Sequence, residues 1–331
     1  MIKIAINGFG RIGRAAAKVI LENDDMELVA VNDLTDSKTL LFLLNHDSSY
    51  GLFDKEMTIS DDEILICGKK VYFFSEKDPS NLPWQALNVD VVLECTGVFL
   101  TTKECASHIR AGAKKVVISA PAKDEETPTY LLGVNSKKYA GEEIISNASC
   151  TTNCIAPVIK VLNDNFVVKQ SVMTTVHSYT ADQNLVDGPH EDLRRARAAA
   201  INIVPTTTGA AKTVTKIITD LDKKFDGLSI RVPTPVVSIS DIVAVLEKSV
   251  TVESVNAAFE KSANDELKNI LAVTDQPLVS SDLIGNTNSA IVDLKLTNVV
   301  GSNLVKVIAW YDNEWGYSCR LVEMAKLVSG Y

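Results

Sequence analysis

Residues 2–14 read IKIAINGFGRIGR, and this stretch decides the fold of the first half of the chain. Its apolar beginning is a strand pattern that leads into Gly8-x-Gly10-x-x-Gly13, where a helix pattern starts. The next apolar strand pattern ends at Asp33, 20 residues after Gly13. A strand, a glycine turn, a helix and a carboxylate in this order predict a dinucleotide-binding unit.

Each residue of this pattern has a physical task in such a unit. Gly8 permits the tight turn, and Gly10 lets the backbone approach a pyrophosphate whose charge the helix N-terminus stabilises. Gly13 lets helix and strand pack closely. Asp33 can accept hydrogen bonds from both adenosine ribose hydroxyls and would repel a 2′-phosphate, so NAD is favoured over NADP. The alternative is a glycine-rich turn without a ligand.

Composition limits the classes of protein that this chain can belong to. With 331 residues, 46% of them hydrophobic and 23% charged, it is long enough for two globular domains. We expect neither a membrane span nor a secretory signal. The net charge of −9 does not favour binding of nucleic acid, which is itself negatively charged. Six cysteines without a CxxC pair favour reduced thiols and a cytoplasmic location.

The rhythm of strands and helices changes near Cys150. Before it, short apolar strands alternate with helices, and 57–74 has the pattern of an inserted hairpin. After it, long strands with few helices are typical of a mixed or antiparallel sheet. We therefore predict a Rossmann-type doubly wound parallel sheet over 1–149 and an α+β catalytic domain over 150–314. The expected strands are 2–7, 27–33, 89–95, 115–119, 168–177, 228–232, 236–247, 289–296 and 304–311, and the expected helices are 11–22, 37–44, 102–112, 151–163, 192–200 and 315–329.

The best candidate for a nucleophile is Cys150, in SNASCTTNCIAP (146–157). It lies where a small polar loop enters a predicted helix, and the positive end of that helix would lower the pKa of the thiol. Cys154 falls on the same helix face and is expected to be a buried neighbour. These cysteines and His177 lack the usual spacing of zinc ligands, so no metal site is predicted.

His177 makes Cys150 more than a buried cysteine at a helix start. It ends the apolar strand MTTVH and opens a polar loop, from which it can meet Cys150 in space. We expect the two side chains to form a thiolate–imidazolium pair, because each charge stabilises the other.

Anion-binding groups follow in the same domain. Arg195 lies in DLRRARAAA (192–200), which reads as the opening of a helix, and Arg231 lies on a predicted strand in RVPTP. Between them, PTTTGAAK places Thr208 and Gly209 at a helix start, where hydroxyls and N–H groups favour an oxyanion. Most single arginines form ordinary ion pairs, but the combination fits phosphate groups.

With these motifs in view, the chain closely resembles glyceraldehyde-3-phosphate dehydrogenase over nearly its whole length. The segments that carry the resemblance are NGFGRIGR, VNDLTD, ECTGVF, ISAPAK, SNASCTTNCIAP, TTVHSYTADQ, DLRRARAAA, PTTTGAAK, RVPTP and WYDNEWGYS. The resemblance implies phosphorylating, NAD-dependent oxidation of glyceraldehyde 3-phosphate through a thioester. It also implies a cytoplasmic homotetramer and a C-terminal helix, 315–331, that returns to the nucleotide domain.

The resemblance further implies a role for individual residues. Cys150 would be the nucleophile and His177 its acid–base partner. Inorganic phosphate would bind Ser149, Thr151, Thr208 and Gly209, and the substrate phosphate would bind Thr180 and Arg231, with Arg195 serving both. NAD would contact Gly8, Gly10, Arg11, Ile12, Gly13, Asp33, Lys77, Ser119 and Asn313.

Other functions remain open at this point. The main alternative is the related erythrose-4-phosphate dehydrogenase, whose thioester is hydrolysed by water. That family generally lacks the Tyr-Thr and Thr-Gly pairs present here at 179–180 and 208–209. A Cys–His hydrolase would bind no NAD, and a non-enzymatic NAD-binding regulator would show no turnover. Gly188 stands where many NAD-preferring relatives have a bulky aliphatic residue, which predicts a modest margin of NAD over NADP.

Overall fold

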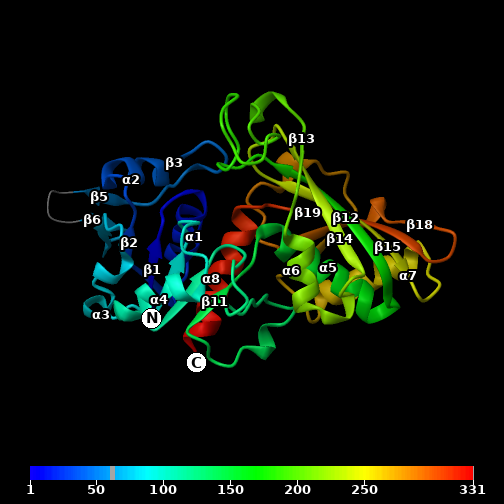
Figure 1. The fold of residues 1–331 in the computed structure, drawn as a ribbon, viewed down its shortest axis with the longest axis horizontal. Helices are drawn as coiled ribbons and strands as arrows, with labels where there is room; N and C mark the ends of the chain where they lie inside the picture. The colour runs from blue at the N-terminus through cyan, green and yellow to red at the C-terminus, as the bar shows by residue number, and fades with distance from the viewer. Residues whose placement is uncertain (60–63, 331) are drawn as a thin grey trace. The chain divides into compact units, whose positions relative to one another are not determined.

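The computed structural model describes residues 1–59 and 64–330 (Figure 1). Its contacts divide the chain into two compact units. The first, here the parallel-sheet unit, contains Met1–Leu131, Ser136–Ala148 and the C-terminal segment from Ser318. The second, here the mixed-sheet unit, contains Leu132–Asn135 and Ser149–Tyr317.

Six parallel strands in the order β11-β10-β9-β1-β2-β8 build the parallel-sheet unit. Helices cover the sheet, and strands such as β9 are therefore buried along their whole length. The strands are β1 (Ile2–Asn7), β2 (Met26–Asn32), β8 (Tyr72–Phe74), β9 (Val91–Glu94), β10 (Lys115–Ile118) and β11 (Ile144–Ser146). The helices are α1 (Arg11–Leu21), α2 (Ser37–Asn45), α3 (Trp84–Leu87), α4 (Thr102–Arg110), α8 (Trp315–Ser329) from Ser318 on, and the 3-10 turns η1 (Pro79–Asn81) and η2 (Ser136–Lys138).

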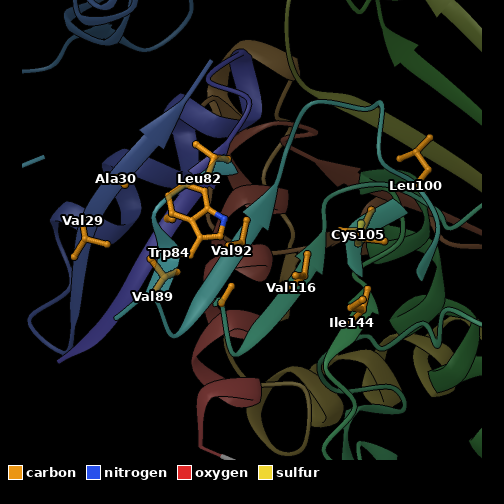
Figure 2. Close-up of a cluster of buried hydrophobic side chains, with 13 residues drawn as sticks. Val29, Ala30, Leu82, Trp84, Val89, Val92, Leu100, Cys105, Val116 and Ile144 are labelled. Atoms are coloured by element: carbon orange, nitrogen blue, oxygen red, sulfur yellow. The ribbon is translucent and has the colours of Figure 1, made fainter. Parts of the chain in front are cut away.

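A buried apolar cluster fills the space between this sheet and its helices. Trp84 of α3 is fully buried in it, together with Val92 of β9, Val116 of β10 and Cys105 of α4 (Figure 2). The cluster holds the strands in place, and the loops that follow β1, β2 and β9 supply most of the residues that line the cavity described below.

The mixed-sheet unit is built on eight strands, in the order β13-β14-β12-β15-β19-β17-β16, with β18 pairing with β19. Burial alternates residue by residue along β15, as expected for a sheet with one covered face. The strands are β12 (Val168–Ser178), β13 (Val204–Thr206), β14 (Phe225–Val232), β15 (Ser238–Leu246), β16 (Leu271–Thr274), β17 (Ala290–Asp293), β18 (Asn298–Val300) and β19 (Leu304–Tyr311). The helices are α5 (Cys150–Phe166), α6 (Ala210–Ile217) and α7 (Val252–Asn264), with the 3-10 turns η3 (Ala199–Ile201), η4 (Thr219–Leu221), η5 (Ser280–Leu283) and η6 (Leu294–Leu296).

The predicted fold class is confirmed, and two local expectations are corrected. The segment 192–200 forms turns rather than a helix, because the carbonyls of Arg195 and Ala196 accept hydrogen bonds from Asn184 and Gly188. These carbonyls therefore do not accept the backbone hydrogen bonds that an α-helix would require. The predicted strand 289–296 ends at Asp293, and helix α7 was not predicted.

The predicted hairpin at 57–74 is a hairpin only in part. Strands β5 (Met57–Ile59), β6 (Ile64–Ile66) and β7 (Lys69–Lys70) form a small antiparallel sheet, whereas β8 extends the parallel sheet beside β2. Residues 60–63 of this prediction lie outside the described residues. A second small hairpin pairs β3 (His46–Asp47) with β4 (Gly51–Leu52). Within the described ranges, no helix has both the length and the apolar character needed to cross a bilayer.

Candidate active site

Helix α5 and strand β12 bring Cys150 and His177 together. Cys150 is the first residue of α5, and the Ser149 side chain caps this helix by accepting a hydrogen bond from the Thr152 amide. His177 is the second-last residue of β12 and is buried. The distance from Cys150 Sγ to His177 Nε2 is 3.4 Å. The pairing expected from the sequence is therefore present as a hydrogen-bonding contact.

The other ring nitrogen fixes which tautomer of His177 faces the thiol. Nδ1 lies 2.6 Å from the carbonyl oxygen of Ser178, which has no proton to give, so Nδ1 carries the proton and donates it. Arg231 Nη1 lies 3.1 Å from Nδ1 and donates to the same carbonyl at 3.2 Å. The Nε2 lone pair is consequently directed at the Cys150 thiol.

Burial and Arg231 set the electrostatics of this pair. Burial raises the pKa of the Cys150 thiol, while the Arg231 guanidinium and hydrogen bonds from Thr151 act to lower it. Burial, followed by the charge of Arg231, lowers the pKa of His177 to about 3. Arg231 thus favours a thiolate but opposes an imidazolium, so the imidazolium half of the expected ion pair is disfavoured before any anion reaches the site.

Two arginines of the mixed-sheet unit reach toward hydroxyl groups. Arg231 Nη1 donates to Thr180 Oγ1 at 3.4 Å, and its Nε is buried without a protein partner. Arg195 donates to Thr206 Oγ1 at 2.9 Å and to the Thr207 carbonyl at 3.2 Å, and it also pairs with Asp182. A buried guanidinium N–H without an acceptor is costly unless an anion or water binds it, so Arg231 is suited to an anionic ligand.

Thr208 and Gly209 lie at the start of α6, as the sequence predicts. Gly209 is the N-cap and has no side chain to cap the helix, Thr208 Oγ1 accepts a hydrogen bond from the Ala210 amide at 3.2 Å, and the space where a Cβ of Gly209 would lie is open. The hydroxyls of Ser149 and Thr151, by contrast, are engaged within the protein. Ser149 Oγ contacts Thr152 Oγ1 at 2.8 Å, and Thr151 Oγ1 contacts the Tyr311 hydroxyl at 3.0 Å.

The parallel-sheet unit contains a cavity of about 590 Å³. This volume is in the range of small-molecule sites. Gly8, Gly10, Asp33 and Lys77 of the predicted cofactor residues line it. Its other lining residues are Asn7, Asn32, Leu34, Glu76, Cys95, Thr96, Val98 and Phe99.

The glycine turn fits a dinucleotide at three separate points. Gly8 has φ +92°, and a Cβ on Gly13 would lie 2.1 Å from the Gly8 carbonyl oxygen, so both positions require glycine. At Gly10 the space for a Cβ is open, and no side chain caps α1, whose positive end therefore suits a phosphate. Asp33 accepts backbone hydrogen bonds from Phe9 and Thr35 at 2.7 and 2.9 Å, which hold its carboxylate at the cavity.

The remaining predicted cofactor residues lie on several elements. Arg11 and Ile12 open α1, and Arg11 forms an ion pair with Asp47 at 2.8 Å. Ser119 follows β10, and its side chain hydrogen-bonds to Cys95, a cavity residue. Asn313 follows β19 in the mixed-sheet unit, where its Oδ1 accepts from Ser238 Oγ at 3.0 Å.

Sequence reasoning missed the polar network beneath the cavity. Asn7 donates to Glu94 Oε2 at 2.6 Å and accepts from Asn32 Nδ2 at 2.7 Å. Thr96 donates its backbone N–H to Glu94 Oε1 at 2.8 Å. A signal was present, because Asn7, Asn32 and Glu94 each end an apolar parallel strand, the edge at which ligands of such sheets bind.

A dinucleotide cavity in a parallel sheet and a cysteine–histidine–arginine centre in a mixed sheet define an NAD-dependent oxidoreductase. Residues 2–102 match the glyceraldehyde 3-phosphate dehydrogenase NAD binding domain, and residues 149–313 match the C-terminal domain of the same enzyme. The chain therefore belongs to the glyceraldehyde-3-phosphate dehydrogenase family.

Individual relatives match along almost the whole chain. The glyceraldehyde-3-phosphate dehydrogenase of Geobacillus stearothermophilus is 52% identical over 330 residues, which are 99% of this chain and 98% of the relative. Glyceraldehyde-3-phosphate dehydrogenase 1 of Bacillus subtilis is 50% identical over 330 residues, again 99% and 98% of the two chains. Glyceraldehyde-3-phosphate dehydrogenase 2 of Synechocystis is 50% identical over 333 residues, 99% of each chain.

Proposed function

We propose that this protein oxidises D-glyceraldehyde 3-phosphate to 1,3-bisphosphoglycerate with NAD and inorganic phosphate, a step of glycolysis and gluconeogenesis. The observation that carries the proposal is the 3.4 Å contact between Cys150 Sγ and His177 Nε2, beside the buried guanidinium of Arg231. The names of the similar proteins support the substrate.

The proposed roles follow the chemistry of the groups. Cys150 Sγ bonds to the aldehyde carbon, while His177 Nε2 accepts the thiol proton and donates it to the aldehyde oxygen. A thiolate formed 3.4 Å away favours the protonated ring, so the two protonation equilibria are coupled. When bound, NAD supplies the hydride acceptor for the oxidation.

The second half of the reaction releases the product from Cys150. After oxidation the carbon is held as a thioester, and the hydroxyl proton has passed to His177. An oxygen of inorganic phosphate attacks the thioester carbon, the carbon–sulfur bond breaks, and the acyl phosphate leaves. The thiolate then recovers its proton from His177, which restores the starting site.

Two sets of groups are proposed to hold the two phosphates. Arg231 and Thr180 would bind the substrate phosphate, because the unpartnered Arg231 Nε needs an acceptor. Inorganic phosphate would bind at the start of α6, at Thr208 and Gly209, where the N-cap has no side chain. Arg195 is proposed to serve both anions, and Ser149 and Thr151 to contribute mainly through their position at the start of α5.

NAD would be held by the glycine turn and Asp33. The turn offers Gly8, Gly10, Arg11, Ile12 and Gly13 at the uncapped start of α1. Lys77, Ser119 and Asn313 are proposed as further contacts. The Asp33 carboxylate favours NAD over NADP, and Asp33→Asn should raise kcat/KM for NADP relative to NAD.

The decisive assay measures NADH formation from glyceraldehyde 3-phosphate with and without inorganic phosphate. Steady-state turnover should require phosphate or arsenate, since an acyl phosphate is the product. An equal steady-state rate in phosphate-free buffer would point instead to thioester hydrolysis, as in an erythrose-4-phosphate dehydrogenase. Arsenate serves as the positive control for an anion that attacks the same thioester.

We further propose a homotetramer in the cytoplasm. The loop between β12 and β13 exposes the large apolar side chains Leu185, Val186, Leu193, Ile201 and Ile203. Five exposed apolar side chains on one loop are unfavourable in water unless another chain covers them. Light scattering should give four times the 35.9 kDa chain mass at micromolar concentration, and a monomer mass would contradict the proposal. The six free thiols agree with a reducing compartment, which cell fractionation can test.

A further inference from the structure

Tyr311 joins the helix that carries Cys150 to the strand that carries His177. It ends β19, is buried, and has no role in the chemistry described above. Its hydroxyl lies 3.0 Å from Thr151 Oγ1 on α5 and 2.8 Å from Thr175 Oγ1 on β12. Thr151 directly follows the nucleophile in sequence. Thr175 lies two residues before His177, and therefore on the same face of the strand.

The three hydroxyls form a short hydrogen-bonded chain. Each hydroxyl can accept one hydrogen bond and donate the next, from Thr175 through Tyr311 to Thr151. Thr151 at the other end hydrogen-bonds to the Cys150 thiol. A single phenol thus ties the position of α5 to the position of β12.

The ring of Tyr311 also contacts the imidazole directly. The ring centroids of Tyr311 and His177 are 6.0 Å apart, and the planes are inclined at 73°, an edge-to-face arrangement. Together with the hydrogen bond from Nδ1 to the Ser178 carbonyl, this packing restricts rotation of the His177 ring. The ionisable groups around the phenol are Cys150 and Cys154 from α5, His177 from β12 and Arg231 from β14.

We propose that Tyr311 is a positioning residue that sets the distance and angle between Cys150 Sγ and His177 Nε2. It acts through hydrogen bonds to Thr151 on one side and to Thr175 on the other, and its ring packs on the imidazole. The proposal rests on the function proposed above, in which these two atoms exchange a proton. A 3.4 Å sulfur–nitrogen contact weakens quickly when either side chain turns, so the bridge controls how readily the thiol loses its proton.

The test is Tyr311→Phe, which removes the hydroxyl and keeps the ring. Alkylation of each cysteine by iodoacetamide is followed across pH by peptide mass spectrometry. The midpoint for Cys150 should move upward by about half a pH unit or more, because a misplaced histidine stabilises the thiolate less. At the same time kcat should fall by roughly 5- to 20-fold with KM for the aldehyde nearly unchanged.

A matched control separates positioning from general loss of a buried phenol. Tyr139 is also buried and donates its hydroxyl hydrogen bond to the Glu142 carbonyl at 2.9 Å, in the parallel-sheet unit. Tyr139→Phe should leave the Cys150 profile and kcat unchanged. The double variant Tyr311→Phe with Thr175→Val should shift the profile no further than Tyr311→Phe alone, since both remove the same bridge.

The outcomes distinguish this inference from the proposed function. If Cys150 is not the most reactive cysteine in the wild-type protein, or if the wild type shows no turnover, the proposed function is wrong. If the wild type behaves as expected and Tyr311→Phe leaves both the Cys150 profile and kcat unmoved, the positioning role of Tyr311 is wrong. If Tyr139→Phe shifts the profile equally, the effect of Tyr311 is general destabilisation and the positioning role is again wrong.

Discussion

The two units each bury one histidine, and the partners of the two rings differ. His108 on α4 is completely buried, and His177 on β12 is 3% exposed. His108 Nε2 lies 3.2 Å from the Glu94 carboxylate, and its Nδ1 accepts the indole N–H of Trp84 at 3.0 Å. His177 contacts a thiol, a backbone carbonyl and a guanidinium, none of which is a carboxylate.

Burial therefore does not indicate which histidine is reactive. The charge of the groups that contact each ring distinguishes the two. In the His108 pair, Nε2 donates to a carboxylate and Nδ1 accepts, so both ring nitrogens are satisfied by fixed groups. At His177 a cation replaces the carboxylate, and the neutral ring presents a lone pair to a thiol. The first arrangement holds a core together, whereas the second is ready to move a proton.

The largest expected effect tests the Cys150 thiol, which contacts His177. Cys150→Ser should lower turnover by roughly 10⁴-fold or more, because serine is a far weaker nucleophile beside a neutral histidine. NAD binding, measured by titration, should remain largely intact, since the glycine turn lies in the other unit. Cys67→Ser, which changes an exposed thiol, should retain full activity. Substantial turnover in Cys150→Ser would contradict the covalent mechanism.

The second prediction compares the two histidines directly. His177→Asn should lower kcat by about 10²- to 10⁴-fold, the usual contribution of a general acid–base group. It should also slow the alkylation of Cys150 near neutral pH. His108→Asn should change kcat by no more than about threefold, since the ring touches no reacting group. Equal losses of kcat in the two variants, at matched folded fractions, would show that His177 is no more important for catalysis than His108.

Sequence patterns predicted many residues of the two sites, but not the contact between Arg231 and His177 that distinguishes the two histidines. The glycine turn, Asp33 and the start of α5 follow from residues close together in the chain, and these were predicted. Arg231 stands beside His177 because β12 and β14 pair in parallel with these two residues in register. Such a register depends on packing across the whole sheet, so it was not visible in local patterns.

Long-range contacts also explain the errors of prediction. Tyr311 and Thr151 are 160 residues apart in the sequence, and no local pattern near either residue predicts their contact. The segment 192–200 has a helical composition, yet hydrogen bonds to Asn184 and Gly188 hold it in turns. His108 lies in helix α4, and its pairing with Glu94 of β9 is visible only from the fold.

The third prediction concerns stability and reverses the order of the two histidines. His108→Asn should lower the free energy of unfolding by about 3 kcal/mol, because it leaves the buried Glu94 carboxylate and the Trp84 N–H without their partner. His177→Asn should cost only about 1 kcal/mol, the value of an ordinary hydrogen bond. Urea unfolding at one fixed protein concentration measures both. A greater loss in His177→Asn than in His108→Asn would show that His177 has the larger structural role.

The last prediction is a pH dependence of stability that belongs to His177. Its pKa is lowered from 6.5 to about 3 in the folded protein, first by burial and then by Arg231. Between these two values the unfolded chain binds more protons at this residue than the folded protein does. The stability is therefore fully present above pH 6.5 and is lost as the pH falls toward 3, with a slope of at most about 1.4 kcal/mol per pH unit.

Carboxylates titrate in part of this window, so the informative quantity is the difference in free energy of unfolding between wild type and His177→Asn across the same pH series. The variant should lose less stability on acidification, and His177→Gln should match it because neither amide titrates. If both amide variants follow the wild-type slope, the His177 ring does not resist protonation, and the contrast with a carboxylate-paired histidine would have to rest on the thiol alone.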